Sequence, residues 1–315
     1  MTTQFARTTG RGPWWRSVVP AMALITLLLG SAQAVNAKIR IAASVTDLAS
    51  IAASIGGDHV ECFAICRPTA DVHHVEVLPS YMVKVSKADV YLKVGMQLDQ
   101  WADQIIDGSR NGNLMIVDCS LGIDALEKPT QRVNALQGDV HPYGNPHYWL
   151  DPRNGVIIAQ EIADALGRVD PEHAADYQAA AEEFTRQVGD EMAKDSAIVA
   201  TLPNRELVTY HSSWVYFGNA FGLSIEGHAE PVPGIPPTAG HLRDLVNLVK
   251  QKAIGVFLQE PYFSDDAGEF LTRQTGLRVV KASPSCDSEE PGSYLAHIDH
   301  ILSMIASPSA DDDGR

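Results

Sequence analysis

Three histidines stand at junctions between predicted strands and helices, where their side chains could together bind a metal ion. His73 lies in the loop after the second predicted strand, His147 just before a capped helix, and His211 directly after a strand. In open α/β sheets, ligands bind beyond the carboxyl ends of the strands. Neutral imidazole suits zinc, and three nitrogens with one oxygen form a common tetrahedral set. These positions predict a site for one zinc ion per chain.

The other histidines give weaker signals. His74 is adjacent to His73 and is a rival ligand, because an extended loop turns neighbouring side chains apart. Six more have no comparable setting, and we expect them to be ordinary surface or core residues: His59, His173, His228, His241, His297 and His300.

The chain around these histidines alternates short apolar strands with amphipathic helices. We expect strands at residues 39–44, 59–66, 89–95, 114–119, 206–210, 254–258 and 278–282, and helices at 47–55, 79–88, 98–106, 151–166, 214–221, 242–250, 267–275 and 294–305. Strands separated by helices imply parallel pairing and an α/β layer architecture. Residues 127–145 have weak periodicity and several turn-forming residues, so we expect a loop there.

A long helical region divides the two groups of strands. Asp151-Pro152 and Asp170-Pro171 are both helix-start signals, with a capping carboxylate before a proline. After the second signal, apolar residues recur at three- and four-residue spacing as far as Ile198. Roughly 30 helical residues at 1.5 Å each span about 45 Å, which is enough to connect two lobes. We therefore predict an α/β protein with two lobes, each a mainly parallel sheet flanked by helices, joined by one long helix.

The first 37 residues have the composition of a secretory signal. Three arginines precede the apolar run 18–30, and small residues follow it, with a cleavage site before Lys38 or after Ala34. A membrane span needs roughly 20 apolar residues, so this run predicts a cleaved signal and a periplasmic protein, with an uncleaved anchor as the alternative. The predicted domains are a signal peptide at 1–37, an N-terminal lobe at 38–169, a linking helix at 170–202, a C-terminal lobe at 203–308 and a disordered tail at 309–315.

Export affects how the four cysteines are interpreted, because an oxidising compartment permits disulfides. Cys62, Cys66, Cys119 and Cys286 allow three pairings, and the sequence does not choose among them. Cys62 and Cys66 would be about 13 Å apart on one strand, which is too far for them to bridge each other. We expect disulfide bonding and leave its connectivity open.

The overall charge limits the possible partners. The chain has 24 basic against 39 acidic residues, a formal charge of −15, and this excludes nucleic acid, whose phosphates require a basic surface. An enzyme is the competing class, because zinc on three histidines with an open fourth position can activate water in a hydrolase or hydratase. The sequence has no HExxH motif and no obvious positioned base, so we expect a protein without enzymatic activity.

Two motifs and one spacing carry a resemblance to a known family. His73 stands six residues before Pro79-Ser80, which opens a helix ahead of the strand at 88–95. The motifs are Asn-Pro-His-Tyr-Trp-Leu-Asp-Pro at 145–152 and Tyr-His-Ser-Ser-Trp-Val-Tyr-Phe at 210–217. Over about residues 38–306 the chain resembles the periplasmic metal-binding proteins, cluster A-I and zinc type, that supply zinc and manganese ABC importers. The resemblance implies two α/β lobes joined by a long helix, with His73 and the histidines of both motifs as ligands.

The resemblance also implies a function and partners. A protein of this kind captures Zn(II) and delivers it to the membrane permease of an ABC-type importer. It acts as a monomer, and whether a periplasmic metallochaperone loads it stays open. The alternatives are a manganese- or iron-binding member and an adhesin-like member of the same fold. His211 favours zinc, because manganese-binding members often have a glutamate at that position, while iron(II) would accept the same nitrogens.

The sequence departs from the family pattern in two places. The family's fourth ligand is usually an aspartate after the last strand, where this chain has Ser283-Pro284. We predict that Asp287 supplies an oxygen ligand instead, with Glu260, Cys286 and water as its rivals. Many zinc members also have a long histidine-rich insertion before the second motif. Residues 137–145 here contain only His141, which weakens any proposal that this loop gathers metal.

Overall fold

The computed structural model describes residues 1–5, 37–131, 133 and 138–307. The chain divides into two units, Met1–Ala37 and Lys38–Arg315, and both sheets belong to the second. Residues 6–36 of the predicted signal peptide and the predicted tail lie outside the described residues. Within the described residues, no helix is both long enough and apolar enough to cross a membrane.

The first lobe is built on four parallel strands in the order β2-β1-β3-β4. These strands are β1 (Ile39–Ala43), β2 (Val60–Ala64), β3 (Val90–Lys93) and β4 (Met115–Asp118). The helices that accompany them are α1 (Thr46–Gly56), α2 (Pro79–Val85), α3 (Trp101–Ser109) and α4 (Pro152–Val169). Strand β1 has a parallel neighbour on each side, and Ile41, Ala42 and Ala43 are fully buried, as a central strand covered on both faces requires.

The second lobe repeats this arrangement in the order β6-β5-β7-β8. Its strands are β5 (Glu206–Thr209), β6 (Ser224–His228), β7 (Val256–Gln259) and β8 (Arg278–Lys281). Its helices are α6 (Val215–Phe221), α7 (Ala239–Lys252) and α8 (Asp266–Thr275). Two parallel sheets flanked by helices confirm the predicted fold class.

Strand β6 was not predicted from the sequence. It pairs only with β5 and therefore lies at the edge of the sheet, and Ile225 is its single large apolar residue. Its register with β5 also shifts between Leu207 and Val208. An edge strand needs little of the apolar pattern that identifies a central one, so the sequence signal was too weak.

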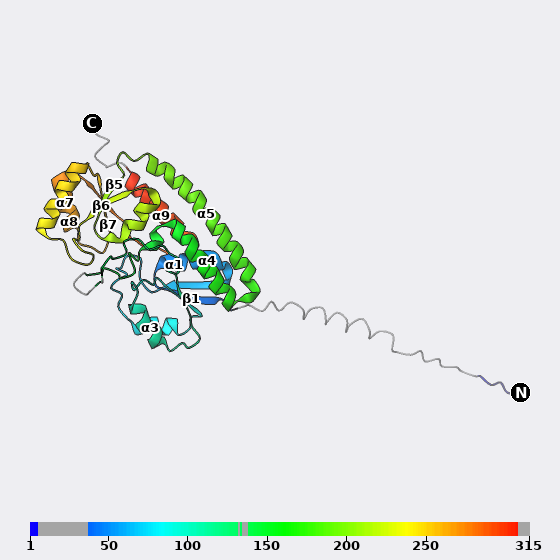
Figure 1. Cartoon of the computed structure of the whole chain (residues 1–315). Coiled ribbons are helices and arrows are strands. Elements are labelled where there is room, and N and C mark those ends of the chain that lie inside the picture. The colour runs from blue at the N-terminus through cyan, green and yellow to red at the C-terminus, as the bar shows by residue number, and fades with distance from the viewer. Residues whose placement is uncertain (6–36, 132, 134–137, 308–315) are drawn as a thin grey trace. The chain divides into compact units, whose positions relative to one another are not determined.

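Both predicted helix-start signals precede helices, but only the Asp151 carboxylate caps one. Asp151 caps α4, because its Oδ1 accepts a hydrogen bond from the Arg153 backbone N–H at 2.9 Å. Asp170-Pro171 opens a 3-10 turn, Pro171–His173, and α5 then runs over Ala174–Ala200. At 27 residues α5 is about 40 Å long. It lies along one side of the two lobes and contacts α4, α1 and α9 (Ser293–Ala306) (Figure 1).

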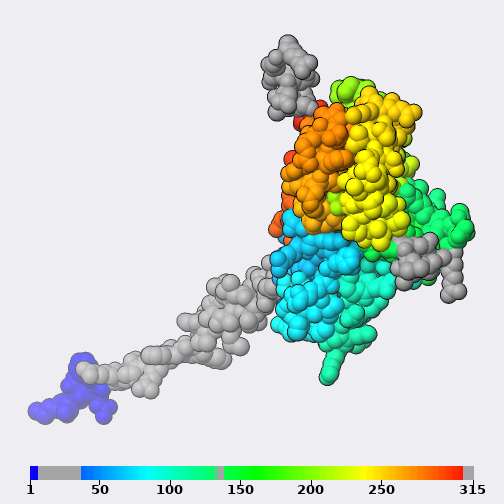
Figure 2. Space-filling model, turned by 90° about the vertical axis from the view of Figure 1, so that its left-hand side faces the viewer, coloured from blue at the N-terminus to red at the C-terminus, as the bar shows by residue number. Residues whose placement is uncertain are grey.

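After β8 the chain returns from the second lobe to the first. Helix α9 packs against α1 and α5 and buries Tyr294 in the core that contains the first sheet. Just before α9, Thr46 Oγ1 donates to the Cys286 carbonyl at 2.6 Å, and Trp149 Nε1 donates to the Pro284 carbonyl at 2.7 Å. On the face that Figure 2 draws, the second lobe (yellow to orange) lies directly on the first (blue to cyan). The return segment, residues 282–292, is therefore attached to the first lobe.

The cysteines correct one expectation, because the structure describes all four and none is paired. Cys62 is half-buried on β2, Cys66 lies just beyond that strand, Cys119 follows β4, and Cys286 is in the return segment. Burial raises the pKa of Cys62 and of Cys66 to about 12, so both are protonated thiols at neutral pH. The four side chains lie on separate elements, and the expected disulfide bonding is not found.

Candidate metal centre

The three predicted histidines lie together, two from the first lobe and one from the second. A ring nitrogen of each of His73, His147 and His211 lies within 4.8 Å of the others. The ring centroid of His73 is 5.2 Å from those of His147 and His211, which are 5.5 Å from each other. A tetrahedral zinc ion with bonds of about 2.05 Å holds its ligand atoms about 3.4 Å apart. Small side-chain rotations would therefore bring all three nitrogens onto one ion.

Each ring is held through Nδ1, which leaves Nε2 to face the centre. The acceptors of the three Nδ1–H groups are Asp71 Oδ1 at 2.8 Å for His73, Asn145 Oδ1 at 3.0 Å for His147 and Glu230 Oε2 at 2.7 Å for His211. Such an acceptor fixes the tautomer and the ring orientation of a metal-binding histidine. Nε2 of His73 and of His147 is buried and has no hydrogen-bond partner among the described residues. Unpartnered buried nitrogens are rare, and a metal ion would satisfy both.

Two of these acceptors stand two residues before their histidine. Asp71 Oδ1 also accepts from the His73 backbone N–H at 2.9 Å, and Asn145 Oδ1 accepts from the His147 backbone N–H at 3.1 Å. These are local turns made by short polar side chains, and they set the direction of the histidine that follows. Sequence reasoning missed both acceptors, although the Asp-x-His and Asn-x-His spacing was available as a signal.

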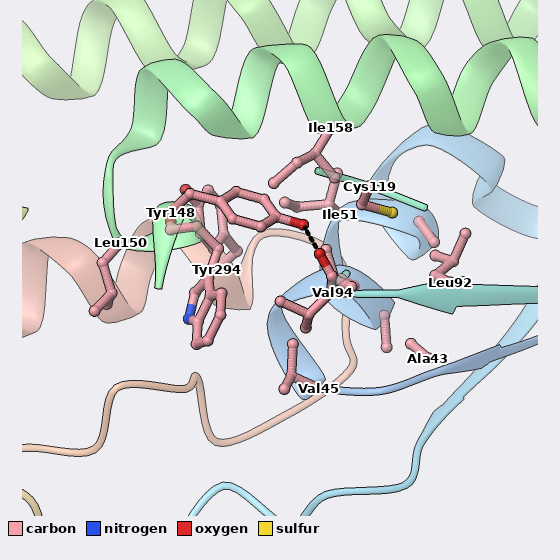
Figure 3. Packing of buried hydrophobic residues seen from close by; sticks show 14 of the residues in the cluster. Ala43, Val45, Ile51, Leu92, Val94, Cys119, Tyr148, Leu150, Ile158 and Tyr294 are labelled. Carbon is pink, nitrogen blue, oxygen red and sulfur yellow. Dashed lines mark hydrogen bonds between the residues drawn. The ribbon is translucent and has the colours of Figure 1, made fainter. Parts of the chain in front are cut away.

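The residues after His147 fix it to the first lobe. Tyr148 is fully buried, and its hydroxyl donates to the Val94 carbonyl at 2.8 Å, just beyond the end of β3 (Figure 3). Asn145, besides orienting His147, donates from Nδ2 to the Ser212 carbonyl of the second lobe at 2.8 Å. The loop that carries His147 is therefore held by both lobes.

His211 and its acceptor come from the ends of two neighbouring strands. His211 lies two residues after the end of β5, and Glu230 lies two residues after the end of β6. Adjacent parallel strands end at the same edge of a sheet, so the two side chains meet there. Gly234 N–H donates to Glu230 Oε2 at 3.0 Å and holds the carboxylate in place. Glu230 was missed at the sequence level because β6 was missed.

The histidines differ in their electrostatic surroundings. Burial lowers the pKa of His147 well below its ordinary value, and neighbouring imidazoles add to this, so His147 is neutral. Burial also acts to lower the pKa of His211, but the hydrogen bond that His211 donates to Glu230 and the charges of Glu260 and Glu230 outweigh it and raise that pKa. His74 is turned away, because its side chain is 68% exposed and its ring is hydrogen-bonded to Asp71 Oδ2 at 3.0 Å.

The structure does not bring Asp287 to the histidines. Asp287 is exposed, and its neighbour Cys286 is tied to the first lobe by a backbone N–H that donates to Asp47 Oδ1 at 3.2 Å. The Cys286 thiol is directed to the Ser288 carbonyl at 3.3 Å. Asp287 is not part of the group of ligand atoms that His73, His147 and His211 form, so the prediction that it completes the site gains no support from the structure.

Of the rival ligands, Glu260 is the one near the histidines. It is fully buried at the end of β7, its Oε1 accepts from Ser213 Oγ at 2.7 Å, and its Oε2 has no partner among the described residues. Burial raises the pKa of Glu260, although the charge of His211 acts in the opposite direction. Glu260 is therefore a buried carboxyl group that acts on His211.

A fourth histidine, His141, lies beside His73, although its loop has no histidine-rich insertion. Its ring centroid is 5.5 Å from that of His73, and its Nε2 is buried without a partner among the described residues. Burial, with the nearby His73 and His211, lowers the pKa of His141 to about 4, so the ring is neutral. His141 lines a cavity of about 250 Å³ that reaches His147 and His211, and another of about 360 Å³ that reaches His73.

Two parallel α/β lobes hold a group of three histidines contributed by both lobes, and the family match places the chain in the class of metal-binding proteins that serve ABC transporters. The chain belongs to the family described as zinc-uptake complex component A, periplasmic, whose model matches residues 41–307.

Individual relatives have names that refer to different metals. The iron-binding protein YfeA of Yersinia pestis is 26% identical over 279 residues, covering 85% of this chain and 86% of that protein. The high-affinity zinc uptake system protein ZnuA of Brucella abortus is 31% identical over 138 residues, or 44% of this chain and 41% of that protein. A crystal structure of ZnuA has a TM-score of 0.75 at 24% identity and covers 86% of this chain and 98% of that one, which supports the fold.

Proposed function

We propose that this protein captures one zinc ion at His73, His147 and His211 and delivers it to the membrane permease of an ABC-type importer. The observation that carries the proposal is the pair of buried Nε2 atoms, on His73 and His147, that have no partner among the described residues and that lie beside His211. Burial of polar atoms without partners costs free energy, and a bound ion removes this cost. We further propose that a cleaved signal over residues 1–37 exports the protein, and that it acts as a monomer.

The choice of zinc rests on the donor atoms. The group of three contains only imidazole nitrogens, which suit zinc, whereas manganese prefers oxygen-rich sets. Iron(II) accepts nitrogen ligands as well. The metal that the protein carries when it is purified from cells therefore distinguishes zinc from iron. Protein purified without added metal should contain zinc at one ion per chain at this site, measured by elemental analysis. A preparation with iron or manganese in place of zinc would contradict the choice of metal.

Delivery to an importer is tested in cells. A strain without the gene should take up less radioactive zinc from zinc-poor medium, and the wild-type gene should restore uptake. A His147→Ala gene should not restore it, although the variant is exported in equal amount. Zinc-loaded protein that hydrates carbon dioxide or hydrolyses esters, with loss of this activity in His147→Ala, would instead support the enzyme alternative.

We propose His141 as the fourth ligand in place of Asp287. Its Nε2 is buried without a partner, and its pKa of about 4 leaves it neutral and able to bind metal. Its loop also reaches the second lobe, since the Asp139 backbone N–H donates to the Pro233 carbonyl at 2.8 Å. An ion held by His141 would lie against this loop.

His141→Ala should weaken zinc binding about tenfold, or about 1.4 kcal/mol, in a titration with a competing chelator. The loss is smaller than for His147 because water can take the fourth position. Asp287→Ala is the matched control and should leave the affinity unchanged. If Glu260→Gln weakened binding and His141→Ala did not, Glu260 would be the fourth ligand.

A further inference from the structure

A second group of metal-ligating side chains lies outside the candidate centre. His59, Asp170 and His173 each offer a ligand atom, and these atoms lie within 4.8 Å of one another. His59 ends the 3-10 turn Gly57–His59 that precedes β2, while Asp170 and His173 form the corner between α4 and α5. His59 and His173 were expected to be ordinary surface or core residues, and Asp170 was expected to start a helix.

The contacts within this group are close. The ring centroids of His59 and His173 are 4.0 Å apart, with 31° between the ring planes. His173 Nδ1 donates to Asp170 Oδ2 at 2.6 Å, and the Tyr177 hydroxyl donates to the same oxygen at 2.8 Å. The side chains of His173 and Asp170 are each about a fifth exposed, at 21% and 22%. The corner therefore holds the Asp170 carboxylate and the His173 ring in fixed positions.

An ion pair between Asp170 and His173 at the start of α5 explains why these two side chains lie together. It does not explain the position of His59. Two imidazoles at this distance repel each other when both are protonated, so proximity alone gives no stabilisation at acidic pH. The carboxylates of Glu172 and Asp176 also act on His173, which makes the surroundings negative. Two imidazoles and a carboxylate in a negative surrounding form a donor set for a divalent transition metal.

We propose that His59, Asp170 and His173 form a second binding site for a divalent ion of the zinc type. The Nδ1–H that His173 donates to Asp170 is the proton that a bound ion would displace, since Nδ1 and the carboxylate oxygen would then both face the ion. Three protein ligands leave at least one position to water, and the site is open to solvent. It should therefore bind zinc more weakly than the buried centre and exchange it faster.

The two sites are independent because they lie at opposite ends of the first sheet. His59 directly precedes β2, whereas His73 follows it, and the five residues of β2 extend about 17 Å. No ligand is shared between the two groups. Variants can therefore remove one site and leave the other intact, which separates this proposal from the proposed transport function.

The experiment counts zinc ions by equilibrium dialysis of the chain from Lys38 onward, which contains both sheets and every helix named above. Any purification tag must be removed or placed at the carboxyl end, because Ile39 pairs with Val60 and a tag ahead of Lys38 would lie beside His59. The wild-type protein should bind one ion tightly and a second at least tenfold more weakly. His147→Ala should lose the tight ion and keep the weak one.

His59→Ala and His173→Ala should each lose the weak ion and keep the tight one. His300→Ala is the matched control, because His300 is exposed on α9 and belongs to no ligand group in the described residues. In the His147→Ala background, zinc should raise the thermal unfolding midpoint, and His173→Ala should abolish this rise. Weak binding that persists in both His59→Ala and His173→Ala, or that is absent from the wild type, would overturn the second site. If the wild-type protein bound the weak ion but not the tight one, the result would contradict the proposed transport site and leave the second site standing.

Discussion

His147→Ala should weaken zinc binding at least about 100-fold, which corresponds to about 2.8 kcal/mol. His147 is 1% exposed, its Nε2 has no other partner among the described residues, and Asn145 fixes the ring in position to bind the ion. The fold already orients this side chain before zinc binds. Its removal therefore loses the bond to zinc and gains nothing from avoiding the entropy cost of ordering a ligand. Zinc titration against a competing chelator at constant pH measures the change.

The control for this variant is His74→Ala. His74 is also next to the centre in sequence, but its side chain is 68% exposed and turned away from the group. It should keep the wild-type affinity. Circular dichroism of both variants without metal should match the wild type, so that a loss of affinity is not a loss of folding. Wild-type affinity in a folded His147→Ala protein would show that the ion binds elsewhere.

Much of the fold could be predicted because its signals are local. Central strands such as β1 and β3 are short and apolar, and the Asp-Pro pairs at 151–152 and 170–171 mark the starts of helices. Alternation of strands and helices then leaves few arrangements other than parallel sheets. Strand β6 carries no such pattern, because an edge strand with one large apolar residue depends on its neighbour for its conformation.

The site was predictable only where a histidine follows or precedes a recognisable element. His73, His147 and His211 met this condition. His141 did not, because it lies in a loop whose position depends on contact with the second lobe through Pro233. Asp287 was chosen because it is the carboxylate nearest in sequence to Ser283-Pro284, where the family has its fourth ligand. Nearness in sequence does not fix where a side chain points, and Asp287 is not in the group of ligand atoms around the three histidines.

As the pH is lowered, zinc affinity should begin to fall while the pH is still above about 6.5, the ordinary pKa of a histidine side chain. Metal binding requires neutral imidazole, so a proton on any ligand must be displaced. His211 has a raised pKa, because the hydrogen bond to Glu230 and the charges of Glu260 and Glu230 outweigh the effect of burial. Below that raised pKa the proton on His211 competes with zinc, and the affinity should fall about tenfold per pH unit. Burial lowers the pKa of His147 well below its ordinary value, so this residue adds no competition in that range.

Glu230→Gln tests this assignment. The amide keeps a hydrogen-bond acceptor for His211 Nδ1 but removes the negative charge, so the pKa of His211 should fall and the loss of zinc should begin at a lower pH. The measurement is a series of chelator-competition titrations from pH 8 to pH 5 on the wild type and the variant. Asp139→Asn is a suitable control, because it removes a negative charge from the loop that carries His141 and leaves the hydrogen bond between His211 and Glu230 in place. Its pH profile should match the wild type. An onset that does not move in Glu230→Gln, or an affinity that stays flat down to pH 5 in the wild type, would contradict a centre in which His211 binds the ion.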